Sequence, residues 1–323
     1  MRVGIDVMGG DYAPIECMKG IAILNKELPD ADEIFLFGNK EIIDPLIIEN
    51  GLNNSRIHLI HCDDVIEMAE SPTKAFASKP NSSIAVGFQY LKAGKIDCFS
   101  SAGNSGAMLV GAMYSVKAIP GVMRPAISTV LPRFDGGVGL LLDIGANADC
   151  KPELLSQFAE LGSLYMQNMY SIQNPKVGLL NIGEEEGKGN NLSQAAYPML
   201  KENSAINFIG NVEGRDIFSN ICDVIVCDGF TGNIVLKFGE SFYDMIKLRK
   251  VADPYFDVFN YENYGGSGII GINAPVVIGH GISKANAIYN MAMLSINITK
   301  SNLVTVLKST FLEKQSLQNE KSE

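Results

Sequence analysis

Short apolar runs alternate along the chain with longer segments in which apolar residues recur every three or four positions. Val3–Val7, Ile34–Phe37 and Ile57–His61 have the length of buried strands, and helical patterns follow the first two, after Pro14 and over 40–50. Strands and helices that alternate at this spacing are typical of a mainly parallel sheet covered by helices. We therefore predict a three-layer α/β/α fold.

One pair of runs departs from this alternation. Ile127–Leu131 and Val138–Leu142 are joined by the short turn PRFDGG, which predicts an antiparallel hairpin inserted in the sheet. The chain shows no internal repeat and no interdomain linker, so we expect a single domain over 1–312 and a disordered polar tail over 313–323. Further strands are expected at Val177–Ile182, Ile206–Ile209, Val224–Cys227 and Pro275–Ile278.

Glycine-rich turns with Asn, Asp, Ser or Lys follow five of the predicted strands. Ligands of open parallel sheets bind at the carboxyl ends of strands, so these turns are expected to face one crevice and to bind an anion such as phosphate. An ordinary set of capped strand-to-helix turns is the alternative for any one of them. The turns lie at 8–11, 100–106, 143–147, 183–190 and 228–233.

The segment Phe99–Ala112, FSSAGNSGAMLVGA, illustrates the pattern best. A strand stops at Ser100-Ser101 and the chain passes through two glycines into an apolar helical pattern. The first backbone N–H groups of such a helix have no intrahelical partner, and nearby Ser and Asn side chains add donors. The segment therefore predicts an anion site at the start of a helix.

Composition and charge narrow the class of protein. The 323 residues are 46% hydrophobic, and the formal net charge of −10 argues against a nucleic-acid partner. With three histidines and no Cys-x-x-Cys pair we predict no metal site, and we expect six reduced thiols. The start MRVGIDVMGGD has no apolar leader, and no run approaches the roughly 18 residues that span a bilayer, so we expect a cytoplasmic protein.

Two common nucleotide-binding motifs, the P-loop and a GxGxxG turn after the first strand, are absent from the sequence. GEEEGKGN is one residue shorter than a P-loop and has no Ser or Thr after its lysine, and no GxGxxG follows the first strand. We therefore predict no nucleotide cofactor. Lys188 in GEEEGKGN is a candidate phosphate ligand or a solvated lysine balanced by the three glutamates, and Asn233 in DGFTGN is a candidate ligand or a helix cap.

Several long motifs occur in one order between Met1 and about Asn297, and together they closely resemble the bacterial phosphate acyltransferases of phospholipid synthesis. The resemblance implies a homodimer that makes acyl-phosphate from acyl-ACP (acyl carrier protein) and inorganic phosphate without a cofactor, for use in glycerol-3-phosphate acylation. It also implies a fold similar to that of isocitrate/isopropylmalate dehydrogenases and phosphotransacetylases. The motifs are GIDVMGGDYAP, SAGNSGAML, RPA, LLDIGAN, GLLNIGEEEGKGN, GNVEGRDI, CDGFTGNIVLK and YGG…GHG.

The resemblance also implies roles for single residues. Lys188 and Asn233 match family motifs and are implied to be catalytic or substrate-positioning, and Ser105 replaces a threonine of the family with retention of the hydroxyl. From the turns and the resemblance together, we expect phosphate and substrate to be bound by Gly9, Gly10, Asp11, Ser101, Gly103, Asn104, Ser105, Gly106, Asn147, Gly183 and Gly232.

The segment 240–263 departs from the family, whose members often carry a longer pair of helices there. It is expected to be a shortened dimer-contact helix, or a segment that gives weak contact with the inner face of the membrane, with a glycerol-3-phosphate acyltransferase or with the acidic carrier protein. The residues behind these alternatives are Lys247, Arg249, Lys250, Phe256 and Phe259.

Three other functions compete with this interpretation. A phosphotransacylase that uses acyl-CoA would share the chemistry and differ in the thioester carrier. A dehydrogenase of the related fold would need a dinucleotide signature and a cluster of metal-binding aspartates, which the sequence does not show. A non-catalytic scaffold is disfavoured because Lys188 and Asn233 are both present.

Overall fold

The computed structural model describes residues 1–251 and 253–320. The chain forms two compact units, each built from two segments: Met1–Ala118 with Tyr261–Lys300, and Ile119–Asn260 with Ser301–Glu323. The prediction of a single domain over 1–312 is therefore corrected. The chain passes from one unit to the other at three places, before Ile119, Tyr261 and Ser301, without a long polar linker that would mark a boundary in the sequence.

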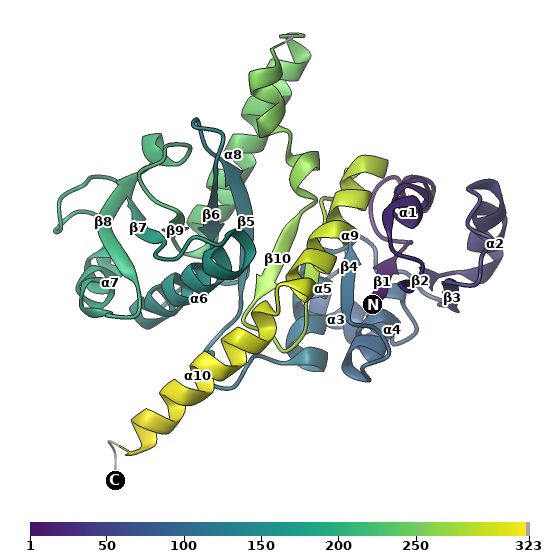
Figure 1. Ribbon diagram of the computed structural model, residues 1–323, viewed down its shortest axis with the longest axis horizontal. Coiled ribbons are helices and arrows are strands. Elements are labelled where there is room, and N and C mark those ends of the chain that lie inside the picture. The colour runs from purple at the N-terminus through teal and green to yellow at the C-terminus, as the bar shows by residue number, and fades with distance from the viewer. Residues whose placement is uncertain (252, 321–323) are drawn as a thin grey trace. The chain divides into compact units, whose positions relative to one another are not determined.

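The first unit contains a mostly parallel sheet (Figure 1). Strands β3, β2, β1, β4 and β11 are parallel in this order, and β10 pairs with β11 in the antiparallel direction. The antiparallel β10 was not predicted. The strands are β1 Arg2–Asp6, β2 Glu33–Gly38, β3 Ile57–His61, β4 Cys98–Ser101, β10 Ser267–Ile270 and β11 Val276–Ile278.

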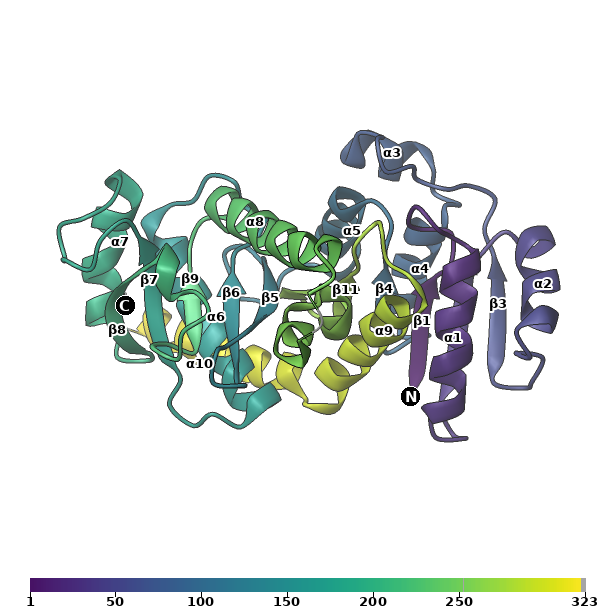
Figure 2. The ribbon, with the colours of Figure 1, turned by 90° about the horizontal axis from the view of Figure 1, so that it is seen from above.

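Two helices of the first unit begin at residues whose side chains cap them. Asn39 accepts a hydrogen bond from the backbone of Glu41, and Ser82 accepts one from Ala85. Helices α1 and α9 lie side by side (Figures 1 and 2), and Gly20 permits their close approach because a Cβ there would lie 2.6 Å from the carbonyl oxygen of Ala285. The helices are α1 Ile15–Glu27, α2 Lys40–Glu49, α3 Pro72–Ser78, α4 Ser83–Lys92, α5 Ser105–Gly111, the π-helical turn η1 Ala112–Val116, the 3₁₀ turn η4 Tyr261–Tyr264 and α9 Ala285–Lys300.

The second unit contains a sheet in the order β5-β6-β9-β7-β8. Strands β6, β9, β7 and β8 are parallel, and β5 pairs with β6 in the antiparallel direction. The predicted hairpin is therefore confirmed. The strands are β5 Ala126–Pro132, β6 Val138–Leu142, β7 Lys176–Asn181, β8 Asn207–Glu213 and β9 Val224–Val226.

The last helix of the second unit extends further along the chain than predicted. Leu303, Leu307 and Phe311 recur every fourth position of α10 and are almost fully buried, and Lys314 pairs with Glu160 of α6 at 2.6 Å. The predicted disordered tail is corrected over 313–320, which is helical, and 321–323 lie outside the described residues. The helices are α6 Pro152–Tyr170, α7 Asn191–Glu202, the 3₁₀ turns η2 Gly214–Asp216 and η3 Pro254–Phe259, α8 Gly229–Leu248 and α10 Leu303–Glu320.

Within 1–251 and 253–320, none of the helices combines the length and the apolar character needed to cross a membrane.

Candidate active site

In the first unit, the turn after β1 packs directly against the turn after β4. A Cβ at Gly9 would lie 2.6 Å from the backbone nitrogen of Gly103, so the two turns can approach only because position 9 is glycine. The hydroxyl of Ser101 donates to the carboxylate of Asp6 at 2.6 Å and accepts from the backbone N–H of Gly103 at 2.9 Å. Asp6 is buried, and this burial raises the pKa of its carboxyl.

Asn104 holds a third segment against the same turns. Its side-chain amide donates to the carbonyl oxygens of Glu67 and Glu70, at 3.0 and 3.1 Å, and its oxygen accepts from the backbone of Ala107 at the start of α5. Asn104 and Ser101 are thus engaged within the protein, whereas the neighbouring Ser105 is exposed. Their roles in binding phosphate stay predictions.

The Gly-His-Gly turn after β11 completes this group in the first unit. The backbone N–H of Asp11 donates to the carbonyl oxygen of Gly281 at 2.7 Å, and Gly10 has a φ of +107°, which favours glycine. Turns that are distant in sequence, 8–11, 101–106 and 279–281, therefore meet at the carboxyl ends of β1, β4 and β11.

In the second unit, the turn after β6 interlocks with the start of α8. A Cβ at Gly229 would lie 2.7 Å from the carbonyl oxygen of Asn147, and a Cβ at Gly232 would overlap the carbonyl oxygen of Asp143. Asn147 is buried and donates from its side chain to the backbone of Pro125 and to Asp143, both at 2.9 Å. Two predicted site turns, 143–147 and 228–233, are therefore in direct contact.

Asp143 is the buried centre of this contact, and sequence reasoning did not select it. Its carboxylate accepts the backbone N–H groups of Ile127, Ala146 and Asn147, at 3.0, 3.0 and 2.6 Å. Burial raises the pKa of the Asp143 carboxyl, and the same donors oppose that shift because they stabilise the charged form. The sequence signal that could have identified both Asp143 and Asp6 is a single aspartate at the end of an apolar strand.

Asn233 lies one helical turn into α8 and faces the turn after β6. Its side-chain nitrogen donates to the carbonyl oxygen of Ile144 at 3.1 Å, and the residue is exposed. An amide nitrogen carries two hydrogens, and this hydrogen bond uses one of those of Asn233. Asn233 does not cap the helix, because Asp228 is the cap and accepts from the backbone of Thr231 at 2.8 Å.

A pocket of about 370 Å³ lies within the second unit, at the carboxyl ends of β7 and β9. The starts of α7 and α8 border it, and its floor is apolar. It brings together the turns 183–190 and 228–233, as the sequence predicts for these two. The sequence analysis did not predict the polar rim of this pocket, although Asn190 and Asp228 have the sequence signals of helix caps. The rim residues are Asn181, Asn190, Ser193, Asp228 and Thr231.

The turn 183–190 presents Lys188 to solvent beside this pocket. The backbone N–H of Lys188 donates to the carbonyl oxygen of Glu185 at 3.0 Å, and its carbonyl oxygen accepts from Asn181 at 3.1 Å. The ammonium lies 3.9 Å from the carboxylate of Glu185, and the side chain is 51% exposed. Gly183 is buried under the stem of Lys188, because a Cβ there would lie 3.0 Å from Cγ of the lysine.

The cysteines are unsuited to nucleophilic chemistry. Burial raises the pKa of Cys98 to about 11 and those of Cys62, Cys150 and Cys222 to about 12. Burial likewise raises the pKa of Cys227, which lines the pocket, well above the ordinary value. Thiols with such pKa values are protonated at neutral pH.

Solved structures define the fold class of the chain. A phosphotransacetylase from Streptococcus pyogenes matches with a TM-score of 0.65 at 16% identity, over 93% of this chain and 94% of that chain. A branched-chain phosphotransacylase from Enterococcus faecalis matches with a TM-score of 0.59 at 12% identity, over 92% and 99%. The chain therefore has the α/β fold that these phosphotransacylases share.

Sequence relatives then give the family. Residues 1–305 match the family model described as fatty acid synthesis protein. A phosphate acyltransferase from Dictyoglomus turgidum is 41% identical over 93% of this chain and 94% of its own length, and one from Caldicellulosiruptor bescii is 41% identical over 95% and 97%. The chain belongs to this phosphate acyltransferase family and is an acyltransferase, as the motifs predict.

Proposed function

We propose that the protein transfers a long-chain fatty acyl group reversibly from acyl-ACP to inorganic phosphate, giving acyl-phosphate and holo-ACP for phospholipid synthesis in the cytoplasm. The observation that carries the proposal is the pocket in which the Lys188 turn meets the start of α8, in a chain of the phosphate acyltransferase family. We also assign the three-layer fold to the isocitrate/isopropylmalate dehydrogenase-like class. A TM-score of 0.50 to a 4-hydroxythreonine-4-phosphate dehydrogenase from Klebsiella pneumoniae supports this assignment.

The reaction needs positioning and charge stabilisation rather than an enzyme nucleophile. A phosphate oxygen attacks the thioester carbonyl, a C–O bond forms, the C–S bond breaks, and the pantetheine thiolate leaves and takes up a proton from solvent. A thiolate is a good leaving group, so a strong general acid is not required. The protein must hold the phosphate dianion over one face of the thioester carbonyl and stabilise the oxyanion that develops on the carbonyl oxygen.

Lys188 and Asn233 divide these two tasks in the proposal. The exposed ammonium of Lys188 supplies a point charge to phosphate, and the starts of α7 and α8 add the positive ends of two helix dipoles at the same pocket. The second amide hydrogen of Asn233 donates to the oxyanion. Gly183, Gly232 and Asn147 shape the backbone around these two side chains.

The turns of the first unit supply the remaining binding groups in the proposal. Ser105 is exposed and offers its hydroxyl, and the glycines keep the backbone free of side chains where a ligand approaches. The proposed phosphate- and substrate-binding residues here are Gly9, Gly10, Asp11, Ser101, Gly103, Asn104, Ser105 and Gly106.

The assay that tests the proposal follows acyl-phosphate and free thiol with palmitoyl-ACP and, separately, palmitoyl-CoA as donors. We expect phosphate-dependent release of holo-ACP that is lost in Lys188→Ala. Lys201→Ala is the matched control, because Lys201 is also exposed and also paired to a glutamate of the same turn, Glu186 at 3.0 Å. Turnover with CoA alone would assign the protein to the phosphotransacylases that use acyl-CoA, and no turnover with either donor would contradict the proposal.

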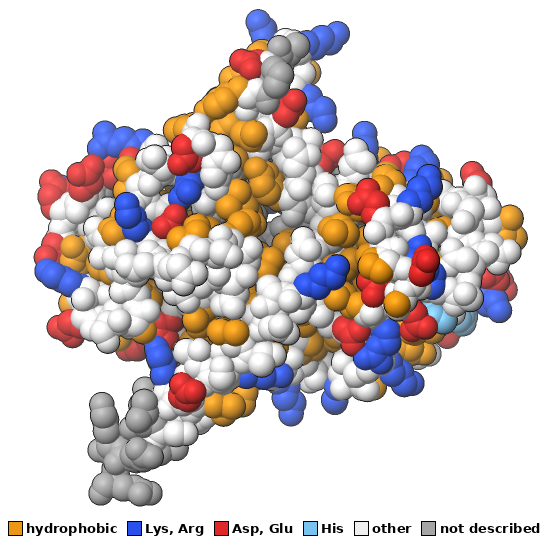
Figure 3. Space-filling model, viewed as in Figure 1, with side chains coloured by type: hydrophobic (Ala, Val, Ile, Leu, Met, Phe, Trp, Pro, Cys, Tyr) orange, Lys and Arg blue, Asp and Glu red, His pale blue; other side chains and the backbone are white. Residues whose placement is uncertain are grey.

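We further propose that α8 forms the interface of a homodimer. Six large apolar side chains recur every three or four positions of this helix, on one face, and are 45–81% exposed. Figure 3 shows hydrophobic side chains over the projecting part of α8 and basic ones at its far end. The six are Phe230, Ile234, Phe238, Phe242, Met245 and Leu248.

The basic end of α8 supports a further part of this proposal. Lys247, Arg249 and Lys250 are exposed there, and we propose that they attract the acidic carrier protein, with weaker contact to the inner face of the membrane or to a glycerol-3-phosphate acyltransferase. Light scattering at several concentrations tests the dimer, and salt dependence of KM for acyl-ACP tests the basic dock. A monomer at micromolar concentration would contradict the first, and a KM independent of salt the second.

A further inference from the structure

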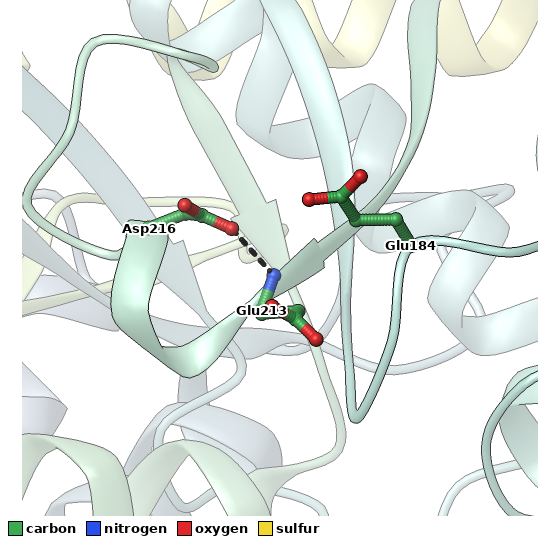
Figure 4. A group of neighbouring side chains, drawn as sticks. All are labelled: Glu184, Glu213 and Asp216. Carbon is green, nitrogen blue, oxygen red and sulfur yellow. Dashed lines mark hydrogen bonds between the residues drawn. The ribbon is translucent and has the colours of Figure 1, made fainter.

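Three carboxylates converge at one corner of the second unit, away from the pocket described above. Glu184 lies in the turn after β7, Glu213 ends β8, and Asp216 lies in η2 (Figure 4). One oxygen of each lies within 4.8 Å of the others. A set of oxygen ligands at such separations is the arrangement that hard divalent cations prefer.

Three carboxylates alone do not establish a site, and Asn211 supplies an independent observation. Asn211 precedes Glu213 by two positions in β8, so both side chains project from the same face of the strand. Asn211 is only 8% exposed, and it lines a pocket of about 350 Å³ together with Glu184 and Asp216.

The amide of Asn211 is half satisfied. Its nitrogen donates to the carbonyl oxygen of Glu185 at 2.8 Å, whereas its buried oxygen Oδ1 has no hydrogen-bond partner among the described residues. A buried acceptor without a donor is unfavourable, and a bound cation would supply the missing partner. Asn211, with this unpartnered oxygen, lines the same pocket as Glu184 and Asp216.

We propose that Glu184, Asn211, Glu213 and Asp216 bind a hard divalent cation such as Mg²⁺, Ca²⁺ or Mn²⁺. Glu213 and Asp216 use one oxygen apiece in the reciprocal cap of η2, and in the structure the carboxylate of Glu213 also contacts Arg215. The cation would take no part in the bond changes of acyl transfer, so the site goes beyond the proposed function.

Arg215 is the internal competitor for this site. Its guanidinium contacts Glu213 and lies 3.9 Å from Glu184, and its side chain is 72% exposed. An exposed arginine of this kind swings into solvent at little cost, so a divalent cation displaces it from the carboxylates. Either the guanidinium of Arg215 or the divalent cation thus offsets the negative charge of these carboxylates.

The site also bears on the turn that carries Lys188. The carbonyl oxygen of Glu185 accepts both the backbone N–H of Lys188 and the side chain of Asn211. A cation bound through Glu184 and Asn211 therefore fixes both sides of Glu185 and limits the motion of the turn 183–190.

The test measures Mn²⁺ binding to the full-length protein by electron paramagnetic resonance and calorimetry, with Mg²⁺ and Ca²⁺ as competitors. We expect one saturable site with Kd below about 1 mM. Glu184→Gln weakens binding about tenfold because it removes a charged ligand, and Arg215→Gln tightens it several-fold because it removes the competitor. Neither variant touches the buried core, and circular dichroism verifies that each is folded.

Two control variants reproduce the same changes of net charge outside the site. Glu186→Gln and Lys201→Gln alter an exposed pair of the same turn and α7, and both are expected to leave the Kd within about twofold. Absence of saturable binding below about 5 mM would overturn the proposal, as would controls that shift the Kd as much as the site variants. Because binding is measured without turnover, failure of the acyl-transfer proposal leaves this result unchanged.

Discussion

Gly232 of α8 lies against the backbone carbonyl of Asp143, and no side chain larger than hydrogen fits between them. This contact fixes the start of α8 on the turn after β6, and one residue later Asn233 reaches the carbonyl oxygen of Ile144. The position of the Asn233 side chain, which is proposed to be catalytic, therefore depends on residue 232 being glycine.

Gly232→Ala is expected to destabilise the protein by about 1–3 kcal/mol, because helix and turn must separate to admit the Cβ. Chemical denaturation measures the free energy of unfolding. Gly239→Ala in the same helix is the control: the nearest atom to its Cβ would lie 3.6 Å away, and alanine there is expected to be neutral or to stabilise by up to about 1 kcal/mol. Equal effects of the two substitutions would contradict the packing described here.

Asp143→Asn is expected to lower the free energy of unfolding by about 2–3 kcal/mol. Both carboxylate oxygens accept N–H donors, so an amide nitrogen in either place leaves donors facing one another in a buried site. Asp149→Asn, an exposed change in the same loop, provides the comparison and is expected to have little effect. A stable Asp143→Asn variant would show that the buried charge is dispensable.

The local elements of this chain were predictable because their signals are local. Asn39 and Ser82 mark helix starts by their own side chains, and the turn PRFDGG specifies the β5–β6 hairpin within a few residues. By contrast, β10 was missed because a four-residue strand is defined by its pairing with β11 rather than by its length.

The site was predictable as a set of motifs but not as a set of contacts. Asn233 and Ile144 are 89 positions apart, and nothing near either residue specifies that they meet. Ser101 and Asn104 were expected to offer donors to a ligand, yet in the structure these donors hold Asp6 and the segment that contains Glu67. A donor that serves the protein and one that serves a substrate have the same sequence signature.

Alkylation by iodoacetamide at pH 7.5 is expected to leave the activity intact over a period that fully modifies a free thiol. Cys150 is only partly buried, yet its surroundings raise the pKa of its thiol to about 12. At pH 7.5 its thiolate is therefore about 10³-fold less populated than that of an ordinary cysteine. Mass spectrometry identifies which thiols react. Rapid inactivation that follows labelling of Cys227 in the pocket would contradict the exclusion of a cysteine nucleophile.

Asn233→Ala is expected to lower kcat by about 10²–10³-fold, the usual effect of losing one oxyanion donor, while KM for phosphate changes little. The residue is exposed and its one hydrogen bond within the protein, to Ile144, is 3.1 Å long, so the free energy of unfolding should fall by no more than about 1 kcal/mol. Lys237→Ala, one turn further along α8, is the control. The side chain of Lys237 is 61% exposed, and among the described residues its ammonium pairs only with Glu240, at 3.0 Å. Steady-state kinetics with varied phosphate separate the two constants. A kcat within about threefold of the parent value would remove Asn233 from the oxyanion role, and a raised KM with unchanged kcat would reassign it to ground-state binding of phosphate.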